Sequence, residues 1–166
     1  MPAPTRWIRE GYIAGLTASA AVAVLYGGFD LFAGRGALFT VDQLGRFLLQ
    51  GTAEFAVASG PAALDLVGVL AYTALHLVAS LVIGMLVCRL VHEAEMEPWQ
   101  AQVALLFIVA GFAGTIAVVG LLSTPIRAVL PWWSIVVANT LAVLVAGSVM
   151  IRRHPGFLGR MTVTPR

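Results

Sequence analysis

The polar side chains that could do chemistry in this chain lie inside long apolar segments. His76 is the most informative of them, and Tyr72 and Thr73 stand about one helical turn before it. Asn139 is a comparable polar residue in a later apolar segment. Polar groups inside a bilayer are costly, so by default they mark a functional site. These four residues are therefore the candidate intramembrane site.

Imidazole chemistry leaves two interpretations of His76 open. As a neutral side chain it can hydrogen-bond across the helices. Asn139 suits this role, because the two residues lie about 15 Å and 10 Å from the starts of their segments at 1.5 Å per residue. As a functional group, His76 could instead contact a quinone, relay protons or ligate a haem or another metal. Paired haem ligation is disfavoured because His92 lies about 24 Å further along the same helix. We predict a His76–Asn139 contact, no metal and no cofactor.

No residue pattern typical of an enzyme is found in the sequence. The chain lacks the GxSxG, HExxH, P-loop and dinucleotide-binding fingerprints. Cys88 is the single cysteine, so neither an internal disulfide nor a CxxC site can form. The residues after it do not match a zinc-ligand spacing and are interpreted as a solvated acidic loop. These are His92, Glu93, Glu95 and Glu97. We expect that the protein is not an enzyme.

Four membrane-spanning helices must position these residues. Hydrophobic residues make up 60% of the 166 residues and charged residues only 11%, against about a quarter in a typical soluble domain. No charge falls in residues 11–29, 66–88, 98–126 or 128–151. Each gap can hold the roughly 20 apolar residues that cross a hydrocarbon core, and such segments must be helical because lipid cannot satisfy backbone amides. The sequence predicts an all-α four-helix transmembrane bundle, one membrane domain of residues 1–166, with spans at 11–32, 62–90, 99–123 and 132–151.

Prolines and tryptophans favour the same boundaries. Pro61, Pro98 and Pro131 sit at or just before a span, where a missing N–H has no cost. All four tryptophans fall at predicted interfaces, where an amphipathic ring prefers the headgroup layer. They are Trp7, Trp99, Trp132 and Trp133. The first span is expected to be retained rather than cleaved, because its apolar run through Phe32 exceeds the about 7–15 residues of a signal-peptide core.

The arginines predict the orientation. Seven of the ten lie in the N-terminus, the second loop and the C-terminus, and three lie in the first and third loops. The positive-inside rule then predicts that both termini lie on the cytoplasmic side of a bacterial inner membrane. On the opposite side, Asp30 is expected to pair with Arg35 or Arg127, which would neutralise its charge near the end of the first span.

The long first loop predicts a short amphipathic helix over residues 41–50. Thr40 and Gln43 have the spacing of a capping box at its start. Asp42 falls on its polar face, and the residues on the opposite face are Val41, Leu44, Phe47 and Leu48. Such a helix could lie in the outer membrane interface or pack on the transmembrane bundle.

Small residues at four-residue spacing predict close helix packing. In the first span they are Gly11, Gly15, Ser19, Ala23 and Gly27. In the fourth span they are Ser134, Ala138, Ala142 and Ala146. Ridges of this kind let membrane helices approach closely. We assign helix-packing roles to Gly11, Gly15, Ser19, Ala138 and Ala142.

Short motifs give the chain a resemblance to a group of small bacterial four-span membrane proteins. One is Arg9-Glu10-Gly11-Tyr12-Ile13-Ala14-Gly15 and another is Tyr72-Thr73-Ala74-Leu75-His76. The third comprises Pro131-Trp132-Trp133-Ser134-Ile135, Asn139 and Arg153-His154-Pro155. The resemblance implies a four-span membrane fold over most of the chain, and it brings no activity with it.

These observations favour a structural or accessory subunit of a larger membrane complex. The expected partners are the lipid bilayer and other membrane subunits, or further copies of this chain. Arginines spread over short loops do not form a nucleic-acid-binding stripe, so no nucleic-acid partner is expected. One alternative is a small oligomeric transporter or channel. Another is a redox-linked subunit that contacts a quinone or haem through His76.

Overall fold

The computed structural model describes residues 6–51, 63–96, 100–127 and 130–154. These residues are almost entirely helical. The elements are α1 (Arg6–Phe32), α2 (Phe39–Gln50), α3 (Leu66–Met96), α4 (Gln100–Leu122), the 3-10 helix η1 (Thr124–Ile126) and α5 (Trp132–Arg153). Pro61, Glu97, Pro98, Trp99 and Pro155, which featured in the sequence analysis, lie outside the described residues.

Four of these helices are long and apolar enough to cross a membrane, as the charge-free gaps predict. They are α1, α3, α5 and the Gln102–Leu122 part of α4, with mean hydropathies of 1.5 to 2.5. The chain is therefore a multi-pass membrane protein. α5 begins directly after Pro131, whose extended backbone (ψ 143°) suits a residue that precedes a helix.

The predicted acidic loop after Cys88 is wrong where the structure describes it. α3 continues to Met96, so His92, Glu93 and Glu95 are helical. Arg89 Nε donates to Glu93 Oε1 at 2.9 Å, a pairing four residues apart that supports a solvent-exposed helix end.

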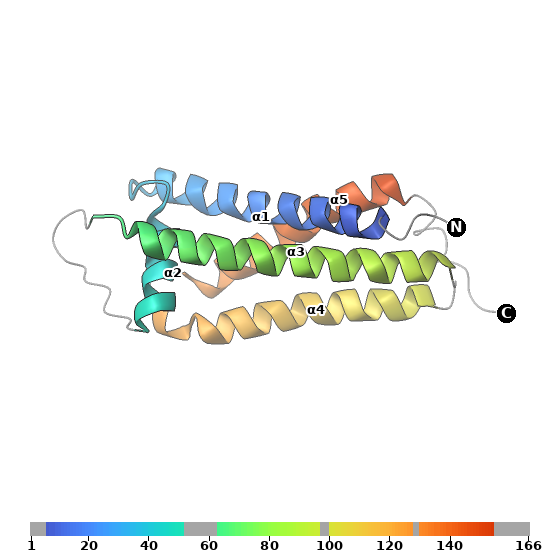
Figure 1. The fold of residues 1–166 in the computed structure, drawn as a ribbon. Helices are drawn as coiled ribbons and strands as arrows, with labels where there is room; N and C mark the ends of the chain where they lie inside the picture. The colour runs from blue at the N-terminus through green and yellow to red at the C-terminus, as the bar shows by residue number, and fades with distance from the viewer. Residues whose placement is uncertain (1–5, 52–62, 97–99, 128–129, 155–166) are drawn as a thin grey trace.

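α3 is the central helix of the structure. It packs against α1, α2 and α4, and α5 packs against α1 and α4. Figure 1 shows the four long helices running side by side, with α2 lying across one end. We call this the α2 end. At the other end lie the start of α1 and the ends of α3 and α5, and we call it the His154 end.

Three glycines bring the backbones of α1 and α3 together. A Cβ on Gly11 would lie 2.5 Å from Met85 Cα, and a Cβ on Gly15 would lie 2.5 Å from the Ser80 carbonyl oxygen. From the α3 side, a Cβ on Gly84 would lie 2.5 Å from the Gly11 carbonyl oxygen. No larger residue fits at this crossing, which fixes the position of α3 on α1.

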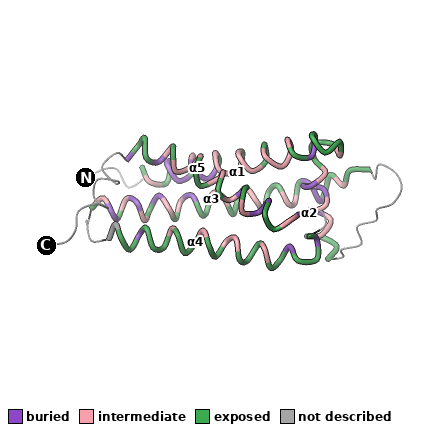
Figure 2. Tube along the Cα trace, turned by 180° about the vertical axis from the view of Figure 1, so that it is seen from behind, coloured by how far each residue is buried: buried purple, intermediate pink, exposed green. Residues whose placement is uncertain are grey.

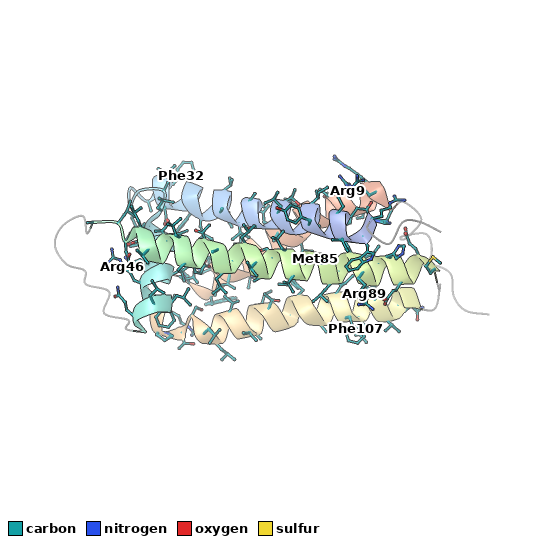
Figure 3. All side chains as sticks on the ribbon, in the orientation of Figure 1. Arg9, Phe32, Arg46, Met85, Arg89 and Phe107 are labelled. Carbon is teal, nitrogen blue, oxygen red and sulfur yellow. The ribbon has the colours of Figure 1, made fainter. Side chains whose placement is uncertain are left out.

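α4 is the least covered of the four long helices. Its side chains at Leu106, Phe107, Leu121 and Leu122 are between 60% and 72% exposed. Exposed residues run along most of α4 in Figure 2. Figure 3 shows Phe107 on the side of α4 that is turned away from α3. The buried apolar residues instead gather near the two ends of the molecule, around Cys88 at the His154 end and Ile126 at the α2 end.

Candidate functional site

A small pocket between α1, α2 and α3 contains three of the four polar residues singled out from the sequence. Tyr72, Thr73 and His76 form its α3 wall. Ser19, Val22, Ala23 and Tyr26 come from α1, and Thr40, Val41 and Leu44 from α2. Its volume is about 60 Å³. We call this the His76 pocket.

The imidazole of His76 is incompletely bonded. Its Nε2 atom is buried and has no hydrogen-bond partner. The ring stacks on Tyr72, with centroids 6.1 Å apart and planes inclined by 17°. Leaving a buried polar group unpaired costs about 1–3 kcal/mol. The pocket therefore offers one hydrogen-bonding nitrogen that the described residues do not use.

The expected His76–Asn139 hydrogen bond is not formed. Asn139 Nδ2 donates instead to the carbonyl oxygen of Ile135, one turn earlier in its own helix, at 2.8 Å. The prediction was wrong because it used only the depth of His76 and Asn139 along their helices. The rotation of each helix about its axis also decides which way a side chain points. Side chains at equal depth meet only when both helices turn them toward each other.

Asp30 holds Thr40, one of the α2 residues that line the pocket. Asp30 is fully buried (0% exposed) and accepts hydrogen bonds from the Thr40 amide at 2.7 Å and the Thr40 hydroxyl at 2.8 Å. Arg35 Nη2 donates to it at 3.0 Å, which is one of the two pairings expected from the sequence. The Arg35 guanidinium also lies over the Phe29 and Phe39 rings, 5.2 and 4.7 Å from their centroids.

This use of Thr40 explains why the predicted capping box is wrong. α2 begins at Phe39, and Leu38 before it provides no side-chain cap. Thr40 lies inside the first turn, and its hydroxyl is committed to Asp30. A carboxylate ten residues away thus displaces the local Thr40–Gln43 interaction that the spacing suggests.

Asp42 joins α2 to the start of α3. It accepts hydrogen bonds from Arg46 Nε at 2.9 Å and from the Asp65 amide at 2.8 Å. Asp65 in turn caps α3 by accepting from the Gly68 amide at 3.1 Å. The bond to Asp42 raises the pKa of Arg46, which also donates to the Ala63 carbonyl at 2.6 Å. Figure 3 shows Arg46 at the α2 end.

The burial of Asp42 corrects the expected amphipathic pattern of α2. This residue was placed on the polar face, but it is 4% exposed, whereas Leu48 is 45% exposed. The reason is the Gly45–Gly68 contact, where two backbones meet so closely that a Cβ on Gly45 would overlap Gly68. That contact turns Asp42 toward α3.

At the His154 end, one histidine links three helices. His154 Nε2 lies 2.9 Å from Glu10 Oε2 on α1, and Nδ1 lies 2.9 Å from Glu95 Oε1 on α3. Both Glu10 and His154 are about 95% buried (5% and 6% exposed). Each ring nitrogen of His154 therefore faces one carboxylate, one on α1 and one on α3. Arg6 also donates to Glu10, at 3.1 Å.

The sequence analysis missed this cluster. Glu10 and His154 are separated by 144 residues, so no local pattern connects them. The available signal was topological, because both residues stand at the predicted cytoplasmic ends of spans. Both also lie within motifs that carry the resemblance described above.

We expect His154→Phe to lower the free energy of unfolding by about 1–3 kcal/mol, because it removes the hydrogen bonds that His154 forms with Glu10 and Glu95 in buried surroundings. Thermal unfolding in detergent measures this effect. His92→Phe is the matched control, since His92 lies near the end of α3 and forms no hydrogen bond with another described side chain. Equal melting temperatures for the two variants would show that the cluster does not stabilise the fold.

Comparison with known proteins gives no information on the function of this site. No protein-family model, curated protein or solved structure matches this chain. Among the residues that the structure describes, no group of three His, Cys, Asp or Glu side chains is placed to hold a metal ion. At the His76 pocket, the described residues leave one buried nitrogen, His76 Nε2, without a hydrogen-bond partner.

The residues assigned to helix packing occupy different places. Gly11 and Gly15 lie at the crossing of α1 and α3. Ser19, one turn further, lines the His76 pocket. In α5, Ala138 is buried and Ala142 is half-buried. The crossing and the pocket are thus consecutive parts of one face of α1.

Proposed function

We propose that this protein is a structural or accessory subunit of a larger membrane complex, and that α4 is the helix that meets the partner. In this proposal the four apolar helices form a bundle in a bacterial inner membrane. Its rigid part is made by α1, α3 and α5, which the Glu10–His154–Glu95 cluster joins at one end. The observation that carries the proposal is the uncovered small-residue surface of α4.

Glycine supports this assignment because it is a poor choice for a helix that faces only lipid. It costs about 0.8–1 kcal/mol relative to alanine in a helix interior, and its use in membrane helices is close approach of a second backbone. Gly11, Gly15 and Gly84 have such a neighbour. Gly28 of α1 and Gly147 of α5 have nothing within 4 Å, and neither do Gly111 and Gly114 of α4, which lie in the least buried of the four long helices. A partner helix would give these two glycines the same role.

The position of Gly111 indicates where a partner helix would contact α4, next to the face that packs on this chain at Ala104. It stands seven residues after Ala104, which is 3% exposed. Seven residues are close to two turns, so both residues lie on nearly the same side of the helix. That side is covered by this chain at Ala104 and open at Gly111. The Thr115 hydroxyl donates to the Gly111 carbonyl oxygen of the same helix at 2.8 Å.

The arginine distribution supports an orientation with both termini in the cytoplasm. The α2 end then faces outward, and α2 lies in the outer interface while it packs on α3. The exposed Trp132 and Trp133 at the start of α5 suit a position at the outer interface, because their rings would reach the headgroup layer.

Photo-crosslinking in native membranes tests the proposal. A photoreactive residue at Leu106 or Phe107 of α4 is expected to give a discrete adduct with a different polypeptide. The same probe at Leu70 or Val78, which are equally exposed on α3, should label lipid alone. Adducts between copies of this chain would favour the alternative of an oligomeric transporter or channel. Lipid labelling from every position would contradict both.

The size of the His76 pocket argues against the alternative of a redox-linked subunit that contacts a quinone or haem through His76. A cavity of about 150 Å³ is known to hold a benzene ring. The His76 pocket measures about 60 Å³ and is too small for a quinone or haem ring.

A further inference from the structure

The α2 side of the His76 pocket is formed largely by buried residues. Thr40 and Leu44 stand over it from α2 and are 1% and 9% exposed. Thr40 is held by two hydrogen bonds to Asp30. On the α1 wall, the Tyr26 hydroxyl lies 3.3 Å from Ser134 Oγ on α5. Two of the three α2 residues that line the pocket are therefore buried.

The lining of the pocket reaches the surface of the molecule at one residue of α1 and one residue of α3. Ala23 of α1 and Thr73 of α3 both line it, and both are exposed. Both belong to helices apolar enough to span a membrane. His76 stands about 15 Å along α3 from Leu66, at 1.5 Å per residue, within the apolar part of this helix. What enters the pocket here must come from the lipid phase.

The size and polarity of the pocket define what it can hold. A volume of about 60 Å³ is less than the space that a six-membered ring needs, and it suits one functional group with its first carbon atoms. A charged group is disfavoured at this depth. A neutral imidazole nitrogen either donates or accepts one hydrogen bond, according to its tautomer.

We infer that the His76 pocket binds the hydroxyl or carbonyl group of an uncharged, membrane-dissolved molecule. The oxygen of that group pairs with His76 Nε2, and its hydrocarbon chain leaves the pocket between Ala23 and Thr73. The Tyr72 ring, stacked on His76, forms the wall beside the bound group. This site is independent of the partner surface proposed for α4.

Nitrogen-15 NMR of histidine-labelled protein in lipid nanodiscs tests the inference. The probes are 1-dodecanol, 2-dodecanone and dodecane. We expect a saturable change in the Nε2 shift of His76 with the alcohol, the ketone or both, and none with dodecane. The alcohol and ketone arms distinguish a hydroxyl from a carbonyl ligand. His92 and His154 are internal controls whose signals should not move. No change at saturating probe, or an equal change with dodecane, would overturn the inference.

A variant that closes the opening adds a second test. Thr73→Phe should abolish the response of His76, while Ala117→Phe on the exposed part of α4 should preserve it. The His154 signal reports whether each variant is folded, because that ring is held by Glu10 and Glu95. A folded Thr73→Phe protein with the full response would refute lateral entry. Ala23→Phe replaces it if Thr73→Phe does not fold.

Discussion

Gly15→Leu is expected to lower the free energy of unfolding by about 3 kcal/mol or more, at the upper end of overpacking costs. Even a Cβ at this position would lie 2.5 Å from the Ser80 carbonyl oxygen and 2.7 Å from Leu81 Cα. These are backbone atoms, so no side-chain rotation can relieve the overlap. Separating α1 from α3 would also open the His76 pocket one turn away. Thermal unfolding of the purified protein in detergent measures the loss.

Gly28→Leu is the matched control for this substitution. Gly28 lies in the same helix, and a Cβ there would meet nothing within 4 Å. We expect this variant to melt within a few degrees of the wild type. Equal stability of the Gly15 and Gly28 variants would show that the crossing of α1 and α3 is not as close as described.

Asp30→Ala is expected to cost about 3–5 kcal/mol, the range for breaking a buried charge pair by removing one partner. Asp30 is 0% exposed, and its loss leaves the Thr40 amide and hydroxyl without an acceptor. Arg35 would lose its ion pair at the same time. Chemical denaturation in mixed micelles gives the free-energy difference. Asp30→Asn should recover part of it, because an amide oxygen can still accept one of these bonds.

Glu93→Ala controls for the loss of an ion pair as such. Glu93 pairs with Arg89 at 2.9 Å, but both side chains are largely exposed (47% and 63%). An exposed pair of this kind contributes about 0–1 kcal/mol. If Asp30→Ala and Glu93→Ala lowered the free energy of unfolding by similar amounts, the Asp30 network would have no special structural role.

The number and position of the long helices could be predicted because one physical rule determines them. A charge within hydrocarbon is costly, so gaps between charges mark the membrane-crossing helices. The ends of these helices were harder to predict. α3 runs on through Glu93 because an Arg89–Glu93 pair and ordinary helix propensity continue the helix beyond the apolar stretch.

Contacts between helices were predicted less well, because they depend on rotation and on distant residues. Asp30 could be matched with Arg35, which follows five residues later. The same carboxylate also binds Thr40, and nothing local indicates that this threonine leaves its capping role. Glu10 and His154 meet only because α1 and α5 pack together. His76 and Asn139 were matched by depth and do not bond.

The two ends of the molecule and its middle differ in how they are held. Buried carboxylates anchor both ends, with Asp30 and Asp42 at the α2 end and Glu10 at the His154 end. Between them, the close approach of α1 and α3 depends on glycine. α4 stands beside this rigid part, with much of its apolar surface uncovered. A scaffold with one open helix is what the proposed accessory role requires.

The mass of the assembly in its native membrane tests the proposed function most directly. Tagged protein would be extracted into lipid nanodiscs without detergent and analysed by native mass spectrometry. We predict a complex that contains this chain and at least one different membrane polypeptide, with Gly111→Leu releasing the partner and Gly28→Leu retaining it. A chain found only with lipid, or only with copies of itself, would contradict the proposal.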